Sequence, residues 1–156
     1  MGLLGVSHVA VGVSDMDRAL LFYRDLVGLD VTLDAVEGAF GGDPDAYRRR
    51  AVYLRGPGGS DDPHAFFIVL DQQLDRDPFG TPPRILQLGT HHFSFWVDDL
   101  RDRFERIAEA GFRVVIPPTE ADAAAYGEPA GSGRYLTAIV KDQDGNPVQF
   151  DQRLSA

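Results

Sequence analysis

The sequence predicts an α+β fold made of two tandem βαβββ modules. A nine-residue segment that starts at His8, HVAVGVSDM, is repeated eighty-four residues later, from His92, as HFSFWVDDL. Apolar residues at helical spacing follow each copy and end at a glycine, Gly28 or Gly111. Three strand-like segments then follow each helix, so the second half repeats the element order of the first.

The first module is expected to cover residues 1–72. Alternating residues predict its first strand at 3–13, and Ser14 or Asp15 is expected to cap the helix because a side-chain oxygen can accept an unpaired amide of the first turn. Further strands are predicted at 30–36, 48–55 and 65–71. The turn-forming segments 37–44 and 56–63 separate them.

A proline-rich linker, residues 73–87, is expected to precede the second module, residues 88–156. Asp98 or Asp99 is expected to cap its helix, and a tight turn is predicted at 142–146. The strands of this module are predicted at 89–97, 112–116, 134–141 and 147–152. The long connection 117–133 is either a lid over a pocket or a surface loop.

The composition excludes several classes of function. With 24 acidic and 15 basic residues the formal charge is −9, which argues against a broad basic face for nucleic acid. No apolar run approaches the roughly 18 residues that span a membrane. The N-terminus lacks a basic leader, so we expect a cytoplasmic protein.

Strand parity identifies a candidate metal site. His92, Ser94 and Trp96 share the face opposite the helix-packed residues, as His8 does in the first copy, whereas His91 does not. Residues 68–72 align with 148–152, so Val69 and Gln149 occupy equivalent positions.

A pseudo-twofold axis between the modules would bring together His8, Val69, His92 and Gln149. Two neutral imidazoles and an amide oxygen could bind a divalent metal. The alternative is that the two histidines are ordinary polar strand residues.

Three segments resemble the vicinal oxygen chelate superfamily, which includes glyoxalase I, bleomycin-resistance proteins and extradiol dioxygenases. These are the opening HVAV at 8–11, the helical LFYRD at 21–25 before Gly28, and the closing DGNPVQ at 144–149. The resemblance implies mixed sheets that curl around a shared cleft, often completed by homodimerisation. It also implies a divalent metal (Fe, Mn, Zn or Ni) on His8, His92 and the terminal-strand position, here Gln149.

The chain departs from the superfamily pattern at three positions. Gln149 replaces a carboxylate, Val69 cannot act as a ligand, and Ile139 stands where extradiol dioxygenases and fosfomycin transferases usually have a tyrosine. With neutral ligands alone, a bound metal would keep its full charge and favour an anionic, bidentate substrate.

Parity also predicts a largely apolar substrate pocket for a small aromatic or hydrophobic molecule. Its expected residues are Val69, Trp96, Tyr135, Thr137 and Ile139. The resemblance therefore favours a metal-dependent dioxygenase, lyase or isomerase. The alternative is a metal-free protein that sequesters a drug or metabolite, as bleomycin-resistance proteins do. No catalytic acid or base is assigned.

Overall fold

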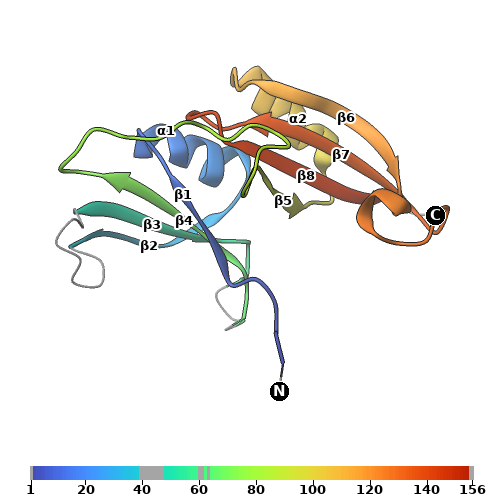
Figure 1. The fold of residues 1–156 in the computed structure, drawn as a ribbon, viewed down its shortest axis with the longest axis horizontal. Helices are drawn as coiled ribbons and strands as arrows, with labels where there is room; N and C mark the ends of the chain where they lie inside the picture. The colour runs from blue at the N-terminus through green and yellow to red at the C-terminus, as the bar shows by residue number, and fades with distance from the viewer. Residues whose placement is uncertain (1, 39–47, 60–61, 63, 155–156) are drawn as a thin grey trace. The chain divides into compact units, whose positions relative to one another are not determined.

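Two four-stranded mixed sheets, one in each of two compact units, form the fold of this computed structural model (Figure 1). The structure describes residues 2–38, 48–59, 62 and 64–154. The units are Met1–Gly80 and Thr81–Ala156, and the division between them falls inside the segment predicted as a linker. The predicted α+β fold of tandem βαβββ modules is confirmed.

Unit 1 has the sheet order β1-β4-β3-β2, in which β1 and β4 are parallel and the other pairs are antiparallel. Its elements are β1 (His8–Gly12), α1 (Met16–Leu20), the π-helical segment η1 (Leu21–Leu26), β2 (Asp30–Glu37), β3 (Arg49–Arg55) and β4 (Phe67–Gln73). The predicted turns at 37–44 and 56–63 lie partly outside the described residues.

Unit 2 repeats this topology, with the order β5-β8-β7-β6 and a parallel β5–β8 pair. Its elements are β5 (Phe93–Trp96), α2 (Leu100–Glu109), β6 (Val114–Asp122), the 3-10 helix η3 (Ala123–Tyr126), β7 (Arg134–Lys141) and β8 (Pro147–Leu154). In each unit the last strand in sequence therefore lies inside the sheet, next to the first.

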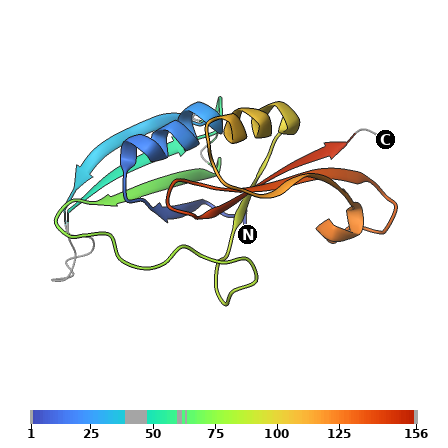
Figure 2. The same cartoon turned by 90° about the horizontal axis from the view of Figure 1, so that it is seen from above.

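Each helix lies along one face of the sheet of its own unit (Figure 2). Asp15 caps α1, and its carboxylate accepts the Arg18 amide at 3.1 Å. Asp99 begins α2, but its carboxylate binds the Arg103 side chain instead of a backbone amide. Gly28 and Gly111 end the two helices with φ of 83° and 84°, the left-handed conformation that favours glycine.

The helix-packed faces form the core of each unit, as strand parity predicts. Val11 in β1 and Ile68 in β4 are buried in unit 1, and Val148 and Phe150 in β8 are buried in unit 2. Phe95 stacks on Phe150 with ring centroids 6.0 Å apart. The opposite face of each sheet carries apolar as well as polar residues, among them the buried Val69 in unit 1 and Ile139 in unit 2.

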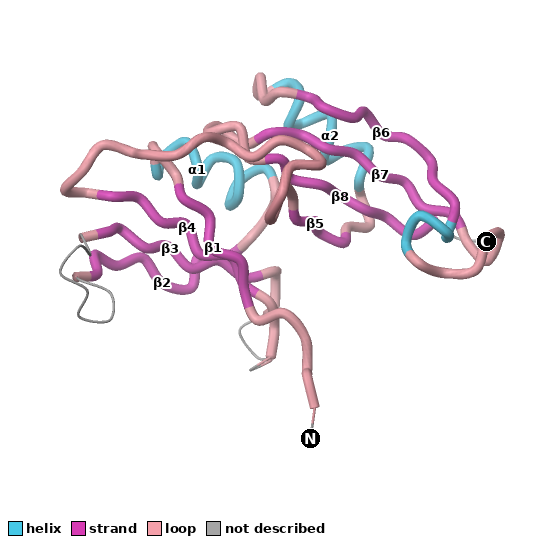
Figure 3. The backbone as a smooth tube through the Cα atoms, in the orientation of Figure 1, coloured by secondary structure: helices cyan, strands magenta, loops and turns pink. Residues whose placement is uncertain are grey.

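Three predicted segments differ from the structure. The first strand of each module is shorter than expected, so that His92 immediately precedes β5 rather than lying inside it. The prediction of a loop is wrong over 117–126, because β6 continues to Asp122 and is followed by η3 (Figure 3), whereas residues 127–133 form neither helix nor strand. Pro117 and Pro118 are tolerated because β6 is an edge strand and its register shifts between Ile116 and Thr119.

Candidate functional site

The face of the second sheet opposite α2 carries Gln149 at its centre. The strand register pairs Gln149 with Ser94 of β5 on one side and with Ile139 of β7 on the other. Residues paired across neighbouring strands point to the same face of a sheet. His92 lies two residues before Ser94 and immediately precedes β5.

The adjacent row of the same face is centred on Asp151. Asp151 pairs with Trp96 of β5 and with Thr137 of β7. Tyr135, two residues before Thr137 on β7, shares this face and pairs with Arg153. Unit 2 thus brings together four of the predicted pocket residues with Gln149: Trp96, Tyr135, Thr137 and Ile139.

Asp151 is a buried carboxylate with a full set of hydrogen-bond donors. Its side chain is 4% exposed. It accepts the phenol of Tyr126 at 2.6 Å, the amide nitrogen of Gln149 at 2.9 and 3.0 Å, and the hydroxyl of Ser94. A buried charged group needs such partners because the loss of water is otherwise costly.

The bond to Asp151 fixes the orientation of the Gln149 amide. Nε2 donates to the carboxylate, which is the assignment that the hydrogen-bond network requires. The carbonyl oxygen Oε1 therefore lies on the other side of the same amide. It is the atom of Gln149 that can act as a ligand or accept a further hydrogen bond.

Three aromatic rings form a cluster beside Asp151. The Tyr126 and Tyr135 centroids are 4.0 Å apart, and Trp96 lies 5.8 and 5.7 Å from them. Tyr135 is buried, and its hydroxyl donates to Glu128 at 2.7 Å, whereas Trp96 is 66% exposed. The exposed indole gives this face an apolar surface that can stack on a ligand.

Burial and the hydrogen bond to Asp151 raise the pKa of Tyr126 to about 12. Its phenol is therefore protonated at neutral pH and acts as a donor. Tyr126 belongs to η3, so this bond joins the 3-10 helix to β8, an interior strand of the sheet.

His91 and His92 form a histidine pair just before β5. Their Nδ1 atoms are 2.7 Å apart, so one ring donates and the other accepts. Burial lowers the pKa of His92, the neighbouring His91 lowers it further, and the charge of Asp151 opposes both effects. In the tautomer in which Nδ1 donates to His91, a neutral His92 leaves Nε2 free to coordinate a metal.

His8 occupies the equivalent place in unit 1. Its Nδ1 lies 2.8 Å from the Ser7 hydroxyl, and its ring stacks on Phe67 at 4.8 Å. Ala10 pairs with Val69, just as Ser94 pairs with Gln149 in unit 2. The register therefore supports the predicted equivalence of His8 with His92 and of Val69 with Gln149, and Val69 is 4% exposed.

The position equivalent to Asp151 in unit 1 is Asp71, and it has different partners. Arg49 lies 3.0 Å from the Asp71 carboxylate and 2.7 Å from Glu37, which also accepts the Tyr53 hydroxyl at 2.9 Å. Burial raises the pKa of Asp71, and the charge of Arg49 opposes that shift. In unit 1, an ion-pair cluster therefore occupies the place that Asp151, Ser94 and Tyr126 occupy in unit 2.

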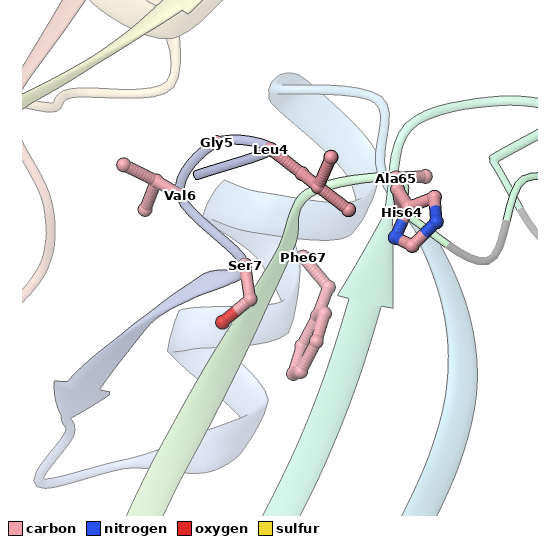
Figure 4. A pocket seen from close by; sticks show the side chains of 7 residues that line it. All are labelled: Leu4, Gly5, Val6, Ser7, His64, Ala65 and Phe67. Carbon is pink, nitrogen blue, oxygen red and sulfur yellow. The ribbon is translucent and has the colours of Figure 1, made fainter. Parts of the chain in front are cut away.

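Unit 1 also contains a small cavity of about 150 Å³ beside the N-terminal end of β1 (Figure 4). It is lined by residues 4–7, by His64 and Ala65, and by the ring of Phe67. Phe67 contacts His8 as well, and Arg55 lies over the same ring at 4.7 Å. The cavity is therefore next to His8 but lies outside the predicted set of site residues.

The described residues contain no cluster of three or more His, Cys, Asp or Glu side chains arranged for a metal ion. The predicted ligand set has two such residues, His8 in unit 1 and His92 in unit 2, and its third member is the amide Gln149. In the part of the chain that the structure describes, no helix has the length and apolar character needed to cross a membrane.

The sequence profile of the Glyoxalase/Bleomycin resistance protein/Dioxygenase superfamily matches residues 5–150. The chain belongs to this superfamily. The match spans both modules and includes His8, His92 and Gln149. The family match and the duplicated strand register both extend over the two halves of the chain.

Similar proteins support the same assignment. An ethylmalonyl-CoA/methylmalonyl-CoA epimerase of Cereibacter sphaeroides is 28% identical over 155 residues, which cover 94% of this chain and 96% of the relative. A glyoxalase family protein of Bacillus cereus has a TM-score of 0.78 at 17% identity, with 99% of this chain and 97% of that chain covered.

A glyoxylase/bleomycin resistance protein/dioxygenase domain of Frankia sp. EAN1pec has a TM-score of 0.66 at 22% identity, with 99% of this chain and 96% of that chain covered. At such low identity, the two solved structures show that the superfamily fold is shared.

The donor types fit the divalent metal that this superfamily implies, with two of them in unit 2 and one in unit 1. His92 is kept neutral by burial, His8 has Nδ1 held by Ser7, and Gln149 has its amide nitrogen bound to Asp151. In the tautomers whose Nδ1–H donates, the Nε2 atoms of both histidines are free, and these atoms and the amide oxygen are of the types that bind first-row divalent metals. Asp151 supplies negative charge one hydrogen bond away from the proposed ligand.

Sequence reasoning missed Tyr126 and the role of Asp151. Asp151 could be recognised by its parity with Gln149, which placed both on one face of the strand. Tyr126 had no such signal, because η3 follows an edge strand whose register shifts twice. Its contact with Asp151 joins residues 25 positions apart in the chain.

Proposed function

We propose that the chain is a metal-dependent enzyme that binds a small substrate through neighbouring oxygens, with His8, His92 and Gln149 as the metal ligands. One observation carries the proposal. Each module places a histidine two residues before the strand residue that pairs with the ligand position, Ala10 with Val69 and Ser94 with Gln149. This duplicated register supports the assignment of His8 and His92 as equivalent ligands, which the superfamily resemblance implies.

The bound metal would supply a Lewis acid that holds and polarises the substrate oxygens. The protein's own part is to bind and orient. The three proposed ligands are neutral, so the double charge of the metal is left for the substrate, which favours an anionic bidentate group such as an enolate, a catecholate or an α-hydroxy acid.

The substrate's carbon skeleton is proposed to contact the predicted pocket residues. Trp96 offers an exposed aromatic surface, and the buried ring of Tyr135 packs against it with the ring centroids 5.7 Å apart. Thr137 and Ile139 extend the same face, and Val69 occupies the equivalent face of unit 1. Such a lining suits a small hydrophobic or aromatic molecule.

Among dioxygenase, lyase and isomerase chemistry, the epimerase relative gives weight to isomerisation. That relative is 28% identical over nearly the whole chain. An isomerase that moves a proton next to a carbonyl passes through an enolate, which is one of the anionic bidentate groups that this ligand set favours. A homodimer is part of the proposal and is tested by light scattering of the purified protein.

The second candidate function is metal-free sequestration of a drug or metabolite. The observation that favours it is the absence of a carboxylate at either ligand position of the central strands, where the chain has Val69 and Gln149. In this case the aromatic face of unit 2 would bind the ligand without chemistry.

Thermal unfolding of tag-free protein distinguishes the two functions. A metal that binds only the native state must stabilise it, so chelator should lower the melting temperature and Mn²⁺, Fe²⁺ or Zn²⁺ should restore it. The His8→Ala and His92→Ala variants should lose the response. His64→Ala is the matched control, because His64 lines the cavity of unit 1 and is outside the proposed ligand set.

A wild-type protein whose melting temperature does not respond to any of these metals would contradict the enzyme proposal and favour sequestration. An equal response in wild type and in His8→Ala would show that His8 is not a ligand.

A further inference from the structure

Asp151 joins three separate segments of unit 2 through one carboxylate. Its donors are Ser94 on β5, Gln149 on its own strand β8, and Tyr126 on η3. The side chain is 4% exposed, so these contacts are made out of bulk water. The strand register brings Ser94 and Gln149 to the face of Asp151, and Tyr126 reaches it from the 3-10 helix 25 positions earlier in the chain.

The chemistry of a carboxylate fixes what Gln149 can present. A carboxylate only accepts hydrogen bonds, whereas an amide has one donating and one accepting end. Gln149 must therefore turn its nitrogen toward Asp151, and both Asp151 oxygens take it, at 2.9 and 3.0 Å. The amide oxygen is left facing the other way, in the only orientation in which Gln149 can coordinate a cation.

We propose that Asp151 is a positioning residue that locks the Gln149 amide with its oxygen toward the metal and ties the Tyr126 ring to the same point. This inference rests on the proposed function, because Gln149 is taken as a metal ligand. It explains how a glutamine can serve where the superfamily commonly has a carboxylate: the negative charge is kept one hydrogen bond away.

Unit 1 provides an internal comparison. Asp71 occupies the equivalent position on β4, but it contacts Arg49, and Val69 stands in the place of Gln149. Asp71 has no amide to orient, so its replacement should affect folding without affecting metal affinity. Asp71→Asn is therefore the matched control for Asp151→Asn.

The test is a double-mutant cycle on Zn²⁺ affinity, measured by competition with a chromogenic chelator. Asn can donate as well as accept, so Asp151→Asn allows the Gln149 amide to flip, and we expect affinity to fall about 10- to 100-fold. The Gln149→Ala variant should lose at least as much Zn²⁺ affinity. If Asp151 acts by positioning Gln149, the double variant should equal Gln149→Ala alone.

A fluorescence measurement provides a readout that does not depend on metal. Trp96 is the single tryptophan of the chain and lies 5.8 Å from the Tyr126 ring. Asp151→Asn and Tyr126→Phe should both shift its emission, because both release η3. Only Asp151→Asn should lose Zn²⁺ affinity, since Tyr126→Phe keeps the Gln149 bond.

Specific outcomes would overturn the inference. Additive losses in the cycle would mean that Asp151 acts through its charge and not through Gln149. An equal loss in Asp71→Asn would mean that the effect is structural. Wild-type protein that binds no Zn²⁺, Mn²⁺ or Fe²⁺ would refute the proposed function, and this inference with it, whereas additivity in a metal-binding protein refutes the inference alone.

A second variant covers the case in which Asp151→Asn does not fold, as judged by loss of a cooperative unfolding transition. Asp151→Glu keeps an acceptor but moves it by one methylene. Asp151→Glu should weaken Zn²⁺ binding by about two- to tenfold. When it is combined with Gln149→Ala, the double variant should bind Zn²⁺ as Gln149→Ala alone does.

Discussion

The two units share the same framework of hydrogen bonds around the central strand and differ in the side chains that lie on its polar face. The Val13 and Val97 amides both donate to the carbonyl of the central-strand aspartate, Asp71 or Asp151, at 2.9 Å. The side-chain amides of Gln72 and Gln152 also donate to equivalent acceptors, the backbone carbonyls of Ser14 and Asp98 just before each helix. The framework has thus been kept in both copies of the duplication.

The side chains on the polar face have diverged. In unit 1 the aspartate belongs to an ion-pair cluster with Arg49, Glu37 and Tyr53. In unit 2 it belongs to a neutral-donor cluster that contains the proposed ligand Gln149. Backbone register is therefore evidence for common architecture, whereas function has to be inferred from the few side chains that differ.

The largest expected effect is on the stability of unit 1. Arg49→Ala leaves Glu37 and Asp71 without their cation, and the half-buried carboxylates then repel each other. We expect a loss of about 2–3 kcal/mol in the free energy of unfolding, measured by urea denaturation. Arg48→Ala is the control, because its pair with Asp75 is exposed, and it should change little.

Replacing Gln149 by glutamate should strengthen metal binding. Gln149→Glu introduces the carboxylate that is common in the superfamily, but it also places two carboxylates side by side with Asp151. We expect the metal-free protein to melt at a lower temperature and Mn²⁺ affinity to rise about tenfold, close to 1.4 kcal/mol. Calorimetric titration measures this, and unchanged affinity would show that position 149 is not a ligand.

Alkaline pH should weaken unit 2 more than unit 1. The pKa of Tyr126 is raised to about 12 by burial and by Asp151. Its phenol therefore adds stability below its unfolded pKa near 10, and that contribution is lost as pH rises from about 10 to about 12. After allowance for solvent screening, wild type should lose about 1 kcal/mol more over this window than Tyr126→Phe does.

Tyr53→Phe is the matched control in unit 1 for the alkaline experiment. Its pKa is raised mainly by the hydrogen bond to Glu37 rather than by burial. The variant should therefore change the alkaline dependence less than Tyr126→Phe does. Equal changes in the two variants would contradict the assigned role of burial at Tyr126.

The smallest expected difference lies at the two helix starts. Asp15→Ala removes a side-chain cap from α1 and should cost about 0.5–1 kcal/mol. Asp99→Ala removes ion pairs to Arg103 and Arg106 but no cap, and should cost about 0.5 kcal/mol or less. Thermal unfolding at low and high salt separates them, because only the Asp99 contribution should be strongly screened.

The duplicated fold could be predicted from the sequence because it depends on the local spacing of apolar residues along strands and helices. Alternation in β1 and β8 identified the buried face, and a shared offset aligned Val69 with Gln149, which the register supports. The Asp15 cap and the terminal glycines Gly28 and Gly111 followed from helix-end chemistry, whereas the predicted side-chain cap of α2 is not formed. These features depend on residues within one or two turns of each other.

The structure of residues 117–133 could not be predicted in this way. Two consecutive prolines suggested a loop, yet an edge strand needs only one set of ladder bonds and accommodates them at a register shift. The Tyr126–Asp151 bond likewise depends on long-range packing, since nothing local to Tyr126 specifies a partner on β8. The cluster around Gln149 was therefore incomplete at the level of sequence.

The interior position of the last strand in each sheet has a consequence for folding. β8 pairs with both β5 and β7. The backbone of Ser94 in β5 can therefore complete its hydrogen bonds only after Gln149, far later in the chain, has been added and has folded. Long-range parallel pairing of this kind forms late and slowly. During synthesis the sheet of unit 1 can close first, and the carboxylate that organises unit 2 is among the last groups to enter its fold.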